Sequence, residues 1–468
     1  MTRLSSIVGQ VNSASKTSNG IRADVAGFSV FLTAYDPSDL PGGSLDPLGF
    51  ERGYLLLADK ILPGLTNVAD RPRYFSILCA GASLADVDLT HNPRTQYERR
   101  LECILRFERF WALANVLASR SSEDGELTTG GIRGVTYVSN RAEAIVSSGI
   151  RRVDANYQLL SRQIPYGVVG IYGAVAEGMR FLDRTTFALT PDLGERLAEG
   201  FLENTDTPKA LIKAIRDSGD VSIETLTEWG RRAHINGQHS SEEQHCMHDA
   251  LHREPVRSRM TEVMKQVPFE SASDTELNRF GRMLPLLARS SSNTDLHESV
   301  LTIRSYESCY QLAMLAFERL LWLGRNLQSG SISPTDISND PVFKLVYDRL
   351  PAATQRLTKC LDEGKTPQFQ MNSERLLDTR QFLEQAAACS GPQPLVQVIL
   401  ERHSEVQRGK FDRGRKKMPW LELSAGRISL TMTRVGGLKK QVTSPTEIAP
   451  HPYRQSSADA MIFASEAT

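Results

Sequence analysis

The sequence predicts a mainly α-helical protein with many helices and a small β-hairpin near its carboxyl end. Apolar residues recur every three or four positions through most of the chain, which is the spacing of one buried helix face. Clusters of proline, glycine and serine separate these stretches, as expected at helix boundaries. Over residues 420–433 the spacing of apolar residues changes to the pattern that predicts β-strands. With 468 residues, 40% of them hydrophobic, the chain has room for about three domains.

The amino-terminal segments are predicted as an arm, an extended stretch and two helices. Residues 1–45 are polar and then rich in turn residues, so we expect a mobile arm followed by an extended segment. Asp46 and Pro47 form a cap and first turn, and the helix that they open is expected to end at Pro63. Its apolar stripe consists of Phe50, Tyr54, Leu57 and Ile61. A second, largely buried helix is predicted over 94–119, because its apolar residues cover more than one face.

The next part of the chain mixes helix signals with a short strand signal. Helices are predicted over 155–163 and 166–182, and a short strand over 184–190. Thr190 and Pro191 provide the cap and first residue of a third helix. The pattern therefore predicts a compact subdomain of three helices and one short strand.

The passage FALTPDLGERLAEGF at 187–201 resembles the strand-to-helix passage of winged-helix proteins, in which an LTxxGxxLA pattern borders the wing. The resemblance implies a winged-helix module over 154–203. A capped amphipathic helix of a generic helical subdomain has the same features, so this interpretation stays open beside the first.

The carboxyl-terminal half is predicted to be helical as far as Arg402. Residues 205–300 are predicted to form helices joined by polar loops, and residues 303–327 a central packing helix with a wide apolar stripe. The segment 420–433 is a hairpin candidate with its turn at 424–426, and the last thirty residues are expected to be irregular. The predicted segments are 1–45 (arm and extended segment), 46–150 (helical domain), 151–265 (winged-helix candidate and following helices), 266–400 (helical domain) and 401–468 (basic helix, hairpin and irregular tail).

Positive charge is concentrated near the carboxyl end, although the 55 basic and 55 acidic residues of the chain cancel. Between residues 401 and 440 there are 11 basic and four acidic residues, so this segment carries +7 and the remainder −7. Dense lysine and arginine beside a hairpin can neutralise phosphates without reading base sequence. An acidic protein surface as the partner and plain exposure to solvent are the two other interpretations.

The residues that we expect to bind lie in the stretch RGKFDRGRKKMPW. Cationic side chains would contact phosphates, while the rings of Phe411 and Trp420 offer surfaces on which single-stranded bases can stack. The predicted nucleic-acid-binding residues are Arg408, Lys410, Arg413, Arg415, Lys416, Lys417 and Trp420. We expect the partner to be DNA, although the sequence does not separate DNA from RNA.

Five of the nine histidines lie between residues 234 and 252. His245, His248 and His252 would share one helical face, and a cysteine and two glutamates nearby add ligand types that zinc accepts. However, the stretch has no HExxH motif, and Ser240 followed by acids is typical of a helix start. We therefore predict solvent-exposed histidines, no metal site and no other cofactor.

The chain shows no catalytic signature, and we favour a non-catalytic role. GxSxG is absent, and an SxxK match at 13–16 falls in the expected mobile arm. The alternative is a metal-dependent nuclease whose acids converge only in three dimensions. Its candidate residues are Asp46, Glu51, Asp59, Lys60 and Glu98. Arg71 and Arg73 flank a turn and are interpreted as surface anchors or a further phosphate contact.

Residues 46–81, 306–322 and 451–454 are similar to uncharacterised bacterial proteins of comparable length, some of which are encoded in mobile-element or antiviral-defence gene neighbourhoods. The resemblance implies a biological setting and transfers no functional residue. We therefore predict a non-catalytic nucleic-acid-binding component of a bacterial multi-protein system. The second alternative is an adaptor that binds an acidic protein partner.

Overall fold

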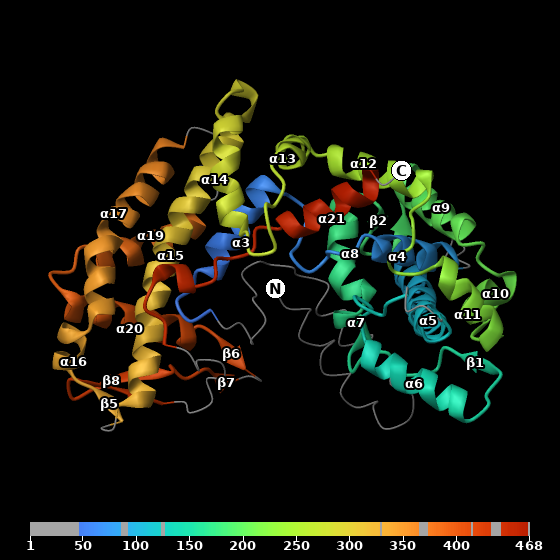
Figure 1. Ribbon diagram of the computed structural model, residues 1–468, viewed down its shortest axis with the longest axis horizontal. Helices are drawn as coiled ribbons and strands as arrows, with labels where there is room; N and C mark the ends of the chain where they lie inside the picture. Colours follow the sequence, from blue (N-terminus) through green and yellow to red (C-terminus); the bar gives the residue numbers. More distant parts are fainter. Residues whose placement is uncertain are drawn as a thin grey trace.

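The protein is mainly helical and forms two lobes, which lie on the left and right of Figure 1. The computed structural model describes residues 46–85, 92–122, 127–327, 330–364, 373–412, 415–431 and 441–466. The predicted fold class, many helices with a small carboxyl-terminal hairpin, is confirmed. The predicted arm and extended segment at 1–45 lie outside the described residues.

The lobe on the right of Figure 1 is built around two buried helices, α4 (Arg73–Ser83) and α5 (Pro93–Arg120). Strands β1 (Arg152–Asp154) and β4 (Asp220–Ser222) pair antiparallel, as do β2 (Leu182–Asp183) and β3 (Ala188–Leu189). The other elements of this lobe are α6 (Val135–Ser147), β1 (Arg152–Asp154), α7 (Gln163–Tyr166), α8 (Val168–Gly178), β2 (Leu182–Asp183), β3 (Ala188–Leu189), the π-helical turn η1 (Pro191–Glu195), α9 (Arg196–Asn204), α10 (Lys209–Asp217), β4 (Asp220–Ser222), α11 (Ile223–Arg232) and α12 (Ser241–His252).

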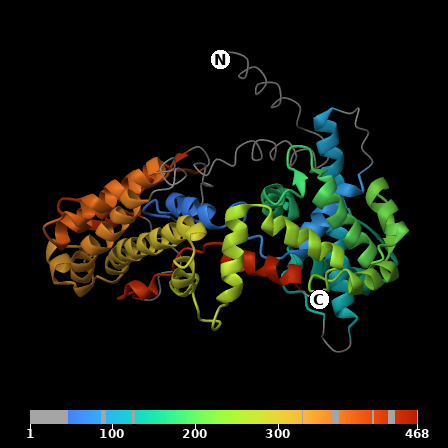
Figure 2. The same ribbon diagram turned by 90° about the horizontal axis from the view of Figure 1, so that it is seen from above.

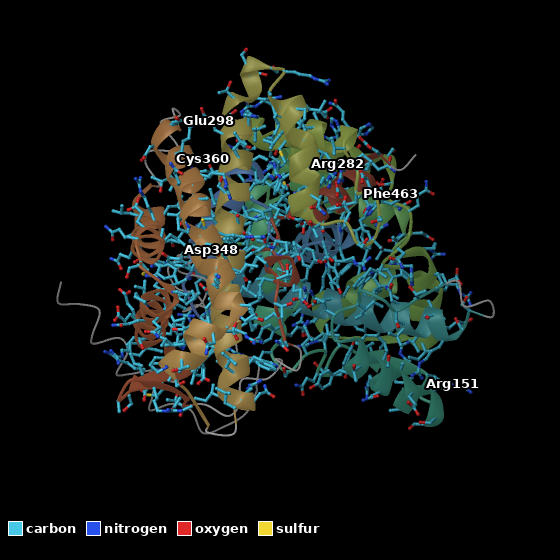
Figure 3. All side chains as sticks on the ribbon, turned by 60° about the vertical axis from the view of Figure 1, so that its left-hand side comes forward. Arg151, Arg282, Glu298, Asp348, Cys360 and Phe463 are labelled. Carbon is cyan, nitrogen blue, oxygen red and sulfur yellow. The ribbon has the colours of Figure 1, made fainter. Side chains whose placement is uncertain are left out.

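The lobe on the left contains the long helix α15 (Thr294–Asn326), which packs along α17 (Pro341–Glu363). Figure 3 shows this pair, with Asp348 and Cys360 on α17, at the opposite side of the molecule from Arg151. The other elements are α3 (Glu51–Ile61), α14 (Glu276–Leu287), η2 (Ser291–Asn293), β5 (Ser331–Ile332), α16 (Pro334–Asn339), α19 (Ser373–Ala387), α20 (Pro392–Arg408), β6 (Phe411–Asp412), β7 (Arg415–Lys416), β8 (Leu421–Ser424), β9 (Arg427–Leu430) and η3 (Pro445–Glu447).

Two helices join the lobes, α13 (Pro255–Gln266) and α21 (Gln455–Glu466). Helix α21 packs against α12 and α13, and α13 also contacts α3. Seen from above, α21 lies between the two lobes (Figure 2). The expectation of an irregular tail is therefore wrong for residues 455–466, which form a helix that holds the lobes together.

The first described helix shows how the local sequence signals operate. The Asp46 carboxylate accepts hydrogen bonds from the backbone N–H groups of Gly49, Phe50 and Glu51 at 2.9, 3.0 and 2.8 Å, and so satisfies donors at the start of the helix. The predicted cap and first turn at Asp46 and Pro47 is nevertheless wrong, because Phe50 is the N-cap residue. The helix itself begins only at Glu51, four positions later than expected. The predicted stripe is confirmed, because its residues are all buried: Phe50, Tyr54, Leu57 and Ile61.

The predicted helices over 94–119 and 303–327 are confirmed as α5 and α15, and Thr190 caps the helical turn at Pro191 as expected. The hairpin of β8 and β9 is also confirmed, with Ala425 and Gly426 at φ 49° and 72° in its turn. The helix expected over 155–163 does not form. The Arg109 guanidinium donates to Ala155 O at 3.1 Å, and the hydroxyl of Tyr157 donates to Arg109 O, so contacts with α5 fix this stretch as irregular backbone.

The segment before α21 is held by two glutamates of the left lobe. The carboxylate of Glu307, which is fully buried on α15, accepts a hydrogen bond from the Tyr453 hydroxyl at 2.6 Å. His451 Nδ1 lies 2.8 Å from the same carboxylate. Glu276 on α14 accepts hydrogen bonds from the backbone N–H groups of Tyr453, which precedes α21, and of Gln455 and Ser456, which are the first donors of the helix. These contacts fix the orientation in which α21 crosses between the lobes.

Arg73 is buried and does not lie at the surface, contrary to the expectation of a surface anchor or phosphate contact. Its guanidinium contacts Glu243 Oε1 at 2.7 Å and the carbonyl oxygens of Gly237 and Gln238 at 2.7 and 2.9 Å. Burial alone would raise the pKa of Glu243, but hydrogen bonds from His239 and Ser76 and the Arg73 charge lower it to about 2. Arg73 is therefore an internal link between α4 and α12.

A third buried glutamate, Glu108 on α5, accepts hydrogen bonds from Val168 N and Gln163 Nε2, both at 2.7 Å. It thereby satisfies a donor at the start of α8. Burial raises the pKa of Glu108 to about 7, although these two hydrogen bonds act in the opposite direction.

We predict that Glu276→Ala lowers the free energy of unfolding by about 2–3 kcal/mol, because several backbone N–H groups at the start of α21 lose their acceptor. Urea denaturation measures this loss, and hydrogen exchange should become faster in residues 455–466. Glu276→Gln, which keeps one carbonyl oxygen, is the control and should lose less. An alanine variant as stable as the parent contradicts the role assigned to Glu276.

We predict that Glu108→Gln weakens the dependence of stability on pH. Since the pKa of Glu108 rises to about 7 in the folded protein, the folded state binds the proton more tightly than the unfolded state. This contribution is fully present below the ordinary pKa near 4.5 and is lost as the pH rises through 7. Over this pH range the free energy of unfolding should fall by on the order of 3 kcal/mol.

Urea denaturation at pH values on both sides of this window tests the prediction. The variant has a lower stability throughout, because its amide replaces an acceptor, but its decrease with rising pH should be smaller than in the parent. Glu98→Gln, at a half-exposed position on the same helix, is the control. An unchanged decrease in the Glu108 variant contradicts the prediction.

Candidate nucleic-acid interface

The stretch with the predicted binding residues folds as a short hairpin at the end of α20. Phe411 pairs with Lys416, and Asp412 with Arg415, in the antiparallel strands β6 and β7. Lys417 N donates to Lys410 O at 3.0 Å and extends the pairing by one residue on each side. Residue 413 and the side chain of Arg415 lie outside the described part of the structure.

The described lysines of this hairpin differ in their surroundings. Lys410 is half-buried, and its Nζ donates to the carbonyl oxygen of Asp46. Burial lowers the pKa of Lys410, and the charge of Lys417 lowers it further, whereas Asp46 and Glu51 act against this. Lys416 is exposed and Lys417 half-exposed, and neither ammonium group forms an ion pair with a described residue. The hairpin therefore presents two lysine charges without a described carboxylate partner.

Arg408 lies in a cleft of about 850 Å³ between α20 and β8. Three carboxylates line the same cleft, those of Glu401, Glu405 and Glu422. Arg402, another cation of the basic segment, is buried and pairs with Asp378 at 2.5 Å. Part of the positive charge counted in the sequence is thus surrounded or paired by acids of the same lobe.

The two predicted stacking residues also differ in exposure. Trp420 is half-buried, with its ring centroid 5.9 Å from Phe317 and 5.4 Å from His403. Its backbone N–H donates to His403 Nε2 at 2.8 Å, so β8 is tied to α20 at this point. Phe411 and Met418 are 55% and 60% exposed and lie open to solvent on the hairpin. Phe411 is therefore the more accessible aromatic ring.

The histidine-rich stretch folds largely as α12 and does not gather its histidines around one point. His239 contacts Glu243 at 3.3 Å, and the rings of His248 and His252 are 4.4 Å apart. His252 Nδ1 lies 2.9 Å from Ser258 Oγ. Among the described residues, no group of three or more histidine, cysteine or acidic side chains is arranged to hold a metal ion.

The acids considered for a nuclease have structural partners. Asp46 accepts a hydrogen bond at the start of α3, Asp59 pairs with Arg454 at 2.7 Å, and Glu98 pairs with Arg94 at 3.0 Å. Lys60 is half-buried on α3, and burial lowers its pKa to about 8. The described contacts of Asp46, Asp59 and Glu98 are therefore those of a helix start and of two ion pairs.

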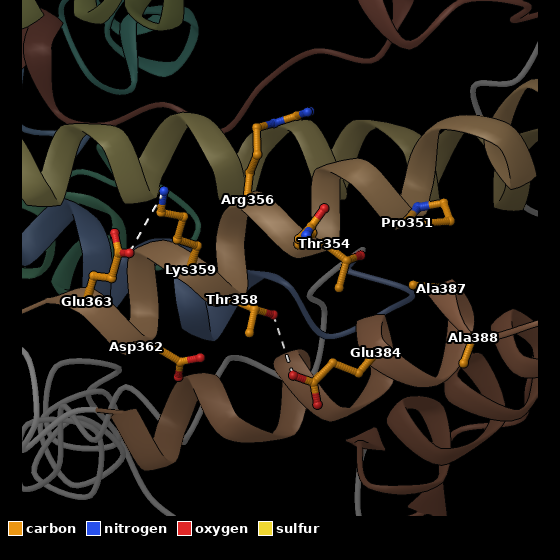
Figure 4. Close-up of a pocket in the computed structure, with 11 residues that line it drawn as sticks. Pro351, Thr354, Arg356, Thr358, Lys359, Asp362, Glu363, Glu384, Ala387 and Ala388 are labelled. Carbon is orange, nitrogen blue, oxygen red and sulfur yellow. Dashed lines mark hydrogen bonds and ion pairs between the residues drawn. The ribbon is translucent and has the colours of Figure 1, made fainter.

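Two further clefts were not found from the sequence. One of about 860 Å³ lies between α17 and α19, where Figure 4 shows Lys359 directed toward Glu363 and Thr358 toward Glu384. The other, of about 900 Å³, lies between α5 and α10, and half of its lining residues are cations. Three basic residues at helical spacing, Lys209, Lys213 and Arg216, are the sequence signal for this cleft. The signal does not show that these residues lie beside α5, which is about one hundred positions earlier in the chain.

The segment with the winged-helix resemblance contains the two-stranded sheet of β2 and β3, followed by η1 and α9. Comparisons with protein-family models, curated proteins and solved structures find no match to this chain. The winged-helix module therefore stays a prediction. None of the helices in the described ranges is long and apolar enough to cross a membrane.

We predict that Trp420→Ala lowers the free energy of unfolding by about 2–3 kcal/mol, because a half-buried indole packed on Phe317 and His403 is lost. Phe411→Ala, at an exposed ring, should change it by less than about 0.5 kcal/mol. The midpoints of urea denaturation of the two variants measure this difference. Equal losses contradict the assignment of Trp420 to the core.

Proposed function

We propose that the protein binds nucleic acid through its phosphate backbone at the basic hairpin, which we define as residues 408–418. The observation that supports this most is the exposure of Lys416 beside the exposed Phe411, with no described carboxylate paired to Lys416 or Lys417. Lysines can neutralise phosphates while an aromatic ring stacks on a base.

The distribution of acids along the basic segment agrees with this position. Its four acids are Glu401, Glu405, Asp412 and Glu422. Three of them line the cleft around Arg408, so positive charge dominates at the hairpin rather than along α20. Between residues 409 and 420 there are five basic residues and one acidic residue, a net charge of +4. We therefore expect Lys416, Lys417, Arg413 and Arg415 to contribute more to binding than Arg408.

We propose a non-catalytic role for the same reasons. Lysines and an exposed ring supply affinity and steering at a phosphate backbone, and the sequence shows no catalytic signature. The proposed setting, one component of a bacterial multi-protein system with a role in antiviral defence, rests only on the sequence resemblance of three segments. DNA is the expected partner.

We predict that Lys416→Ala/Lys417→Ala weakens binding of single-stranded DNA by about tenfold or more, because two charge-assisted contacts are lost. Filter binding between about 50 and 200 mM salt measures the affinity and its salt dependence. The slope of log affinity against log salt should become less steep by about 1.5, since each phosphate contact contributes about 0.7 to 0.9. Lys344→Ala/Lys359→Ala, on the exposed face of α17, is the control with the same loss of charge.

Three further experiments distinguish the proposed function from the nuclease and the adaptor. Duplex DNA and RNA of equal length identify the preferred nucleic acid. Cleavage that depends on a divalent ion supports a nuclease and contradicts the non-catalytic role. Affinity that is insensitive to salt, or equal losses in the hairpin and control variants, overturns the proposed site. A stoichiometric acidic protein that copurifies without nucleic acid supports the adaptor instead.

A further inference from the structure

The cleft between α5 and α10 is separate from the basic hairpin. It lies in the right-hand lobe, with α10 near the edge of the molecule in Figure 1, whereas β6 and β7 belong to the left-hand lobe. Ala85, two residues after the end of α4, is part of the lining of the cleft. The lining residues are Ala85, Arg99, Glu102, Cys103, Arg106, Lys209, Ile212, Lys213, Arg216 and Asp217. With five cations and two carboxylates, the described lining has a net charge of +3.

Two of the three arginines of this cleft are held in place by backbone oxygens. Arg106 Nη1 donates to Ile215 O at 2.8 Å, and its Nη2 donates to Glu102 at 3.0 Å. Arg216 Nε donates to Leu84 O at 3.0 Å. Because these guanidinium groups are fixed before any ligand arrives, a ligand loses less free energy in ordering them. A rigid set of N–H donors is the arrangement that suits tetrahedral oxyanions.

The two lysines of the cleft carry positive charge that no described carboxylate neutralises. Lys209 and Lys213 are exposed and one helical turn apart on α10. Neither ammonium group has an ion pair or side-chain hydrogen bond with a described residue. Two free ammonium groups on one wall and fixed guanidinium groups beside them raise the local concentration of anions in a concave site.

We propose that this cleft binds a ligand with at least two phosphate groups. The two lysine charges, with the fixed guanidinium groups of Arg106 and Arg216 beside them, match a diphosphate better than a monoanion. The side chains of Ile212 and Cys103 provide apolar surface beside the charges for an attached group. The shared chemistry is a phosphate ester or anhydride, found in a nucleotide or at the phosphorylated end of a nucleic acid. This site does not depend on the proposed function of the hairpin.

Isothermal titration calorimetry of the full chain with inorganic pyrophosphate tests the proposal. We expect saturable binding to the parent protein and a loss of about 10- to 100-fold in affinity for Lys209→Ala/Lys213→Ala. Lys344→Ala/Lys359→Ala is the control with matched charge, and Lys416→Ala/Lys417→Ala is the control for the hairpin. Both controls should bind pyrophosphate as the parent does.

Two arms distinguish the sources of phosphate. Tighter binding of ATP than of pyrophosphate supports a nucleotide, and tighter binding of a 5′-phosphorylated oligonucleotide than of its 5′-hydroxyl form supports a nucleic-acid end. The proposal is overturned if the parent does not bind pyrophosphate, or if Lys209→Ala/Lys213→Ala and the control variants bind it equally. Loss in the hairpin variant alone also overturns it, because the phosphate then binds at residues 408–418.

Discussion

The arrangement of the two lobes depends on how the left lobe holds the segment before α21. Glu307 and Glu276 bind His451, Tyr453 and the first N–H groups of α21, and α21 then packs on α12 of the right lobe. A carboxylate at the start of a helix satisfies orphan donors and meets the positive end of the helix dipole. The path of α21 between the lobes is set by these contacts.

Buried glutamates have the same role elsewhere, but their charge states differ. Glu108 and Glu276 have no ion pair with a described residue, and burial raises the pKa of each to about 7. Glu243 is as buried as Glu108, but it has Arg73, Ser76 and His239 as partners, and these contacts lower its pKa to about 2. A cation and extra donors decide whether a buried carboxylate stays charged. The α4–α12 link is therefore ionic, whereas the caps of α8 and α21 respond to pH near neutrality.

The neutral overall charge conceals two separate positive regions, one on each lobe. The basic hairpin comes from a single dense stretch of sequence, while the α5–α10 cleft combines residues about one hundred positions apart. They differ in form, because an exposed hairpin can lie along an extended polyanion, whereas a concave site suits a compact one. Together they are consistent with a protein that binds phosphate-bearing ligands at two places.

The sequence by itself determined the elements whose signals are local. The stripe of α3, the long helices α5 and α15 and the hairpin of β8 and β9 follow from residue spacing and turn chemistry within each element. It also located the dense positive charge at 408–417. It could not show which charges face solvent, since the carboxylate that pairs with Arg73 lies 170 positions away. Likewise, only the tertiary structure decided that 155–163 is irregular and that 455–466 is helical, because the stabilising groups lie on α5 and α14, far away in the sequence.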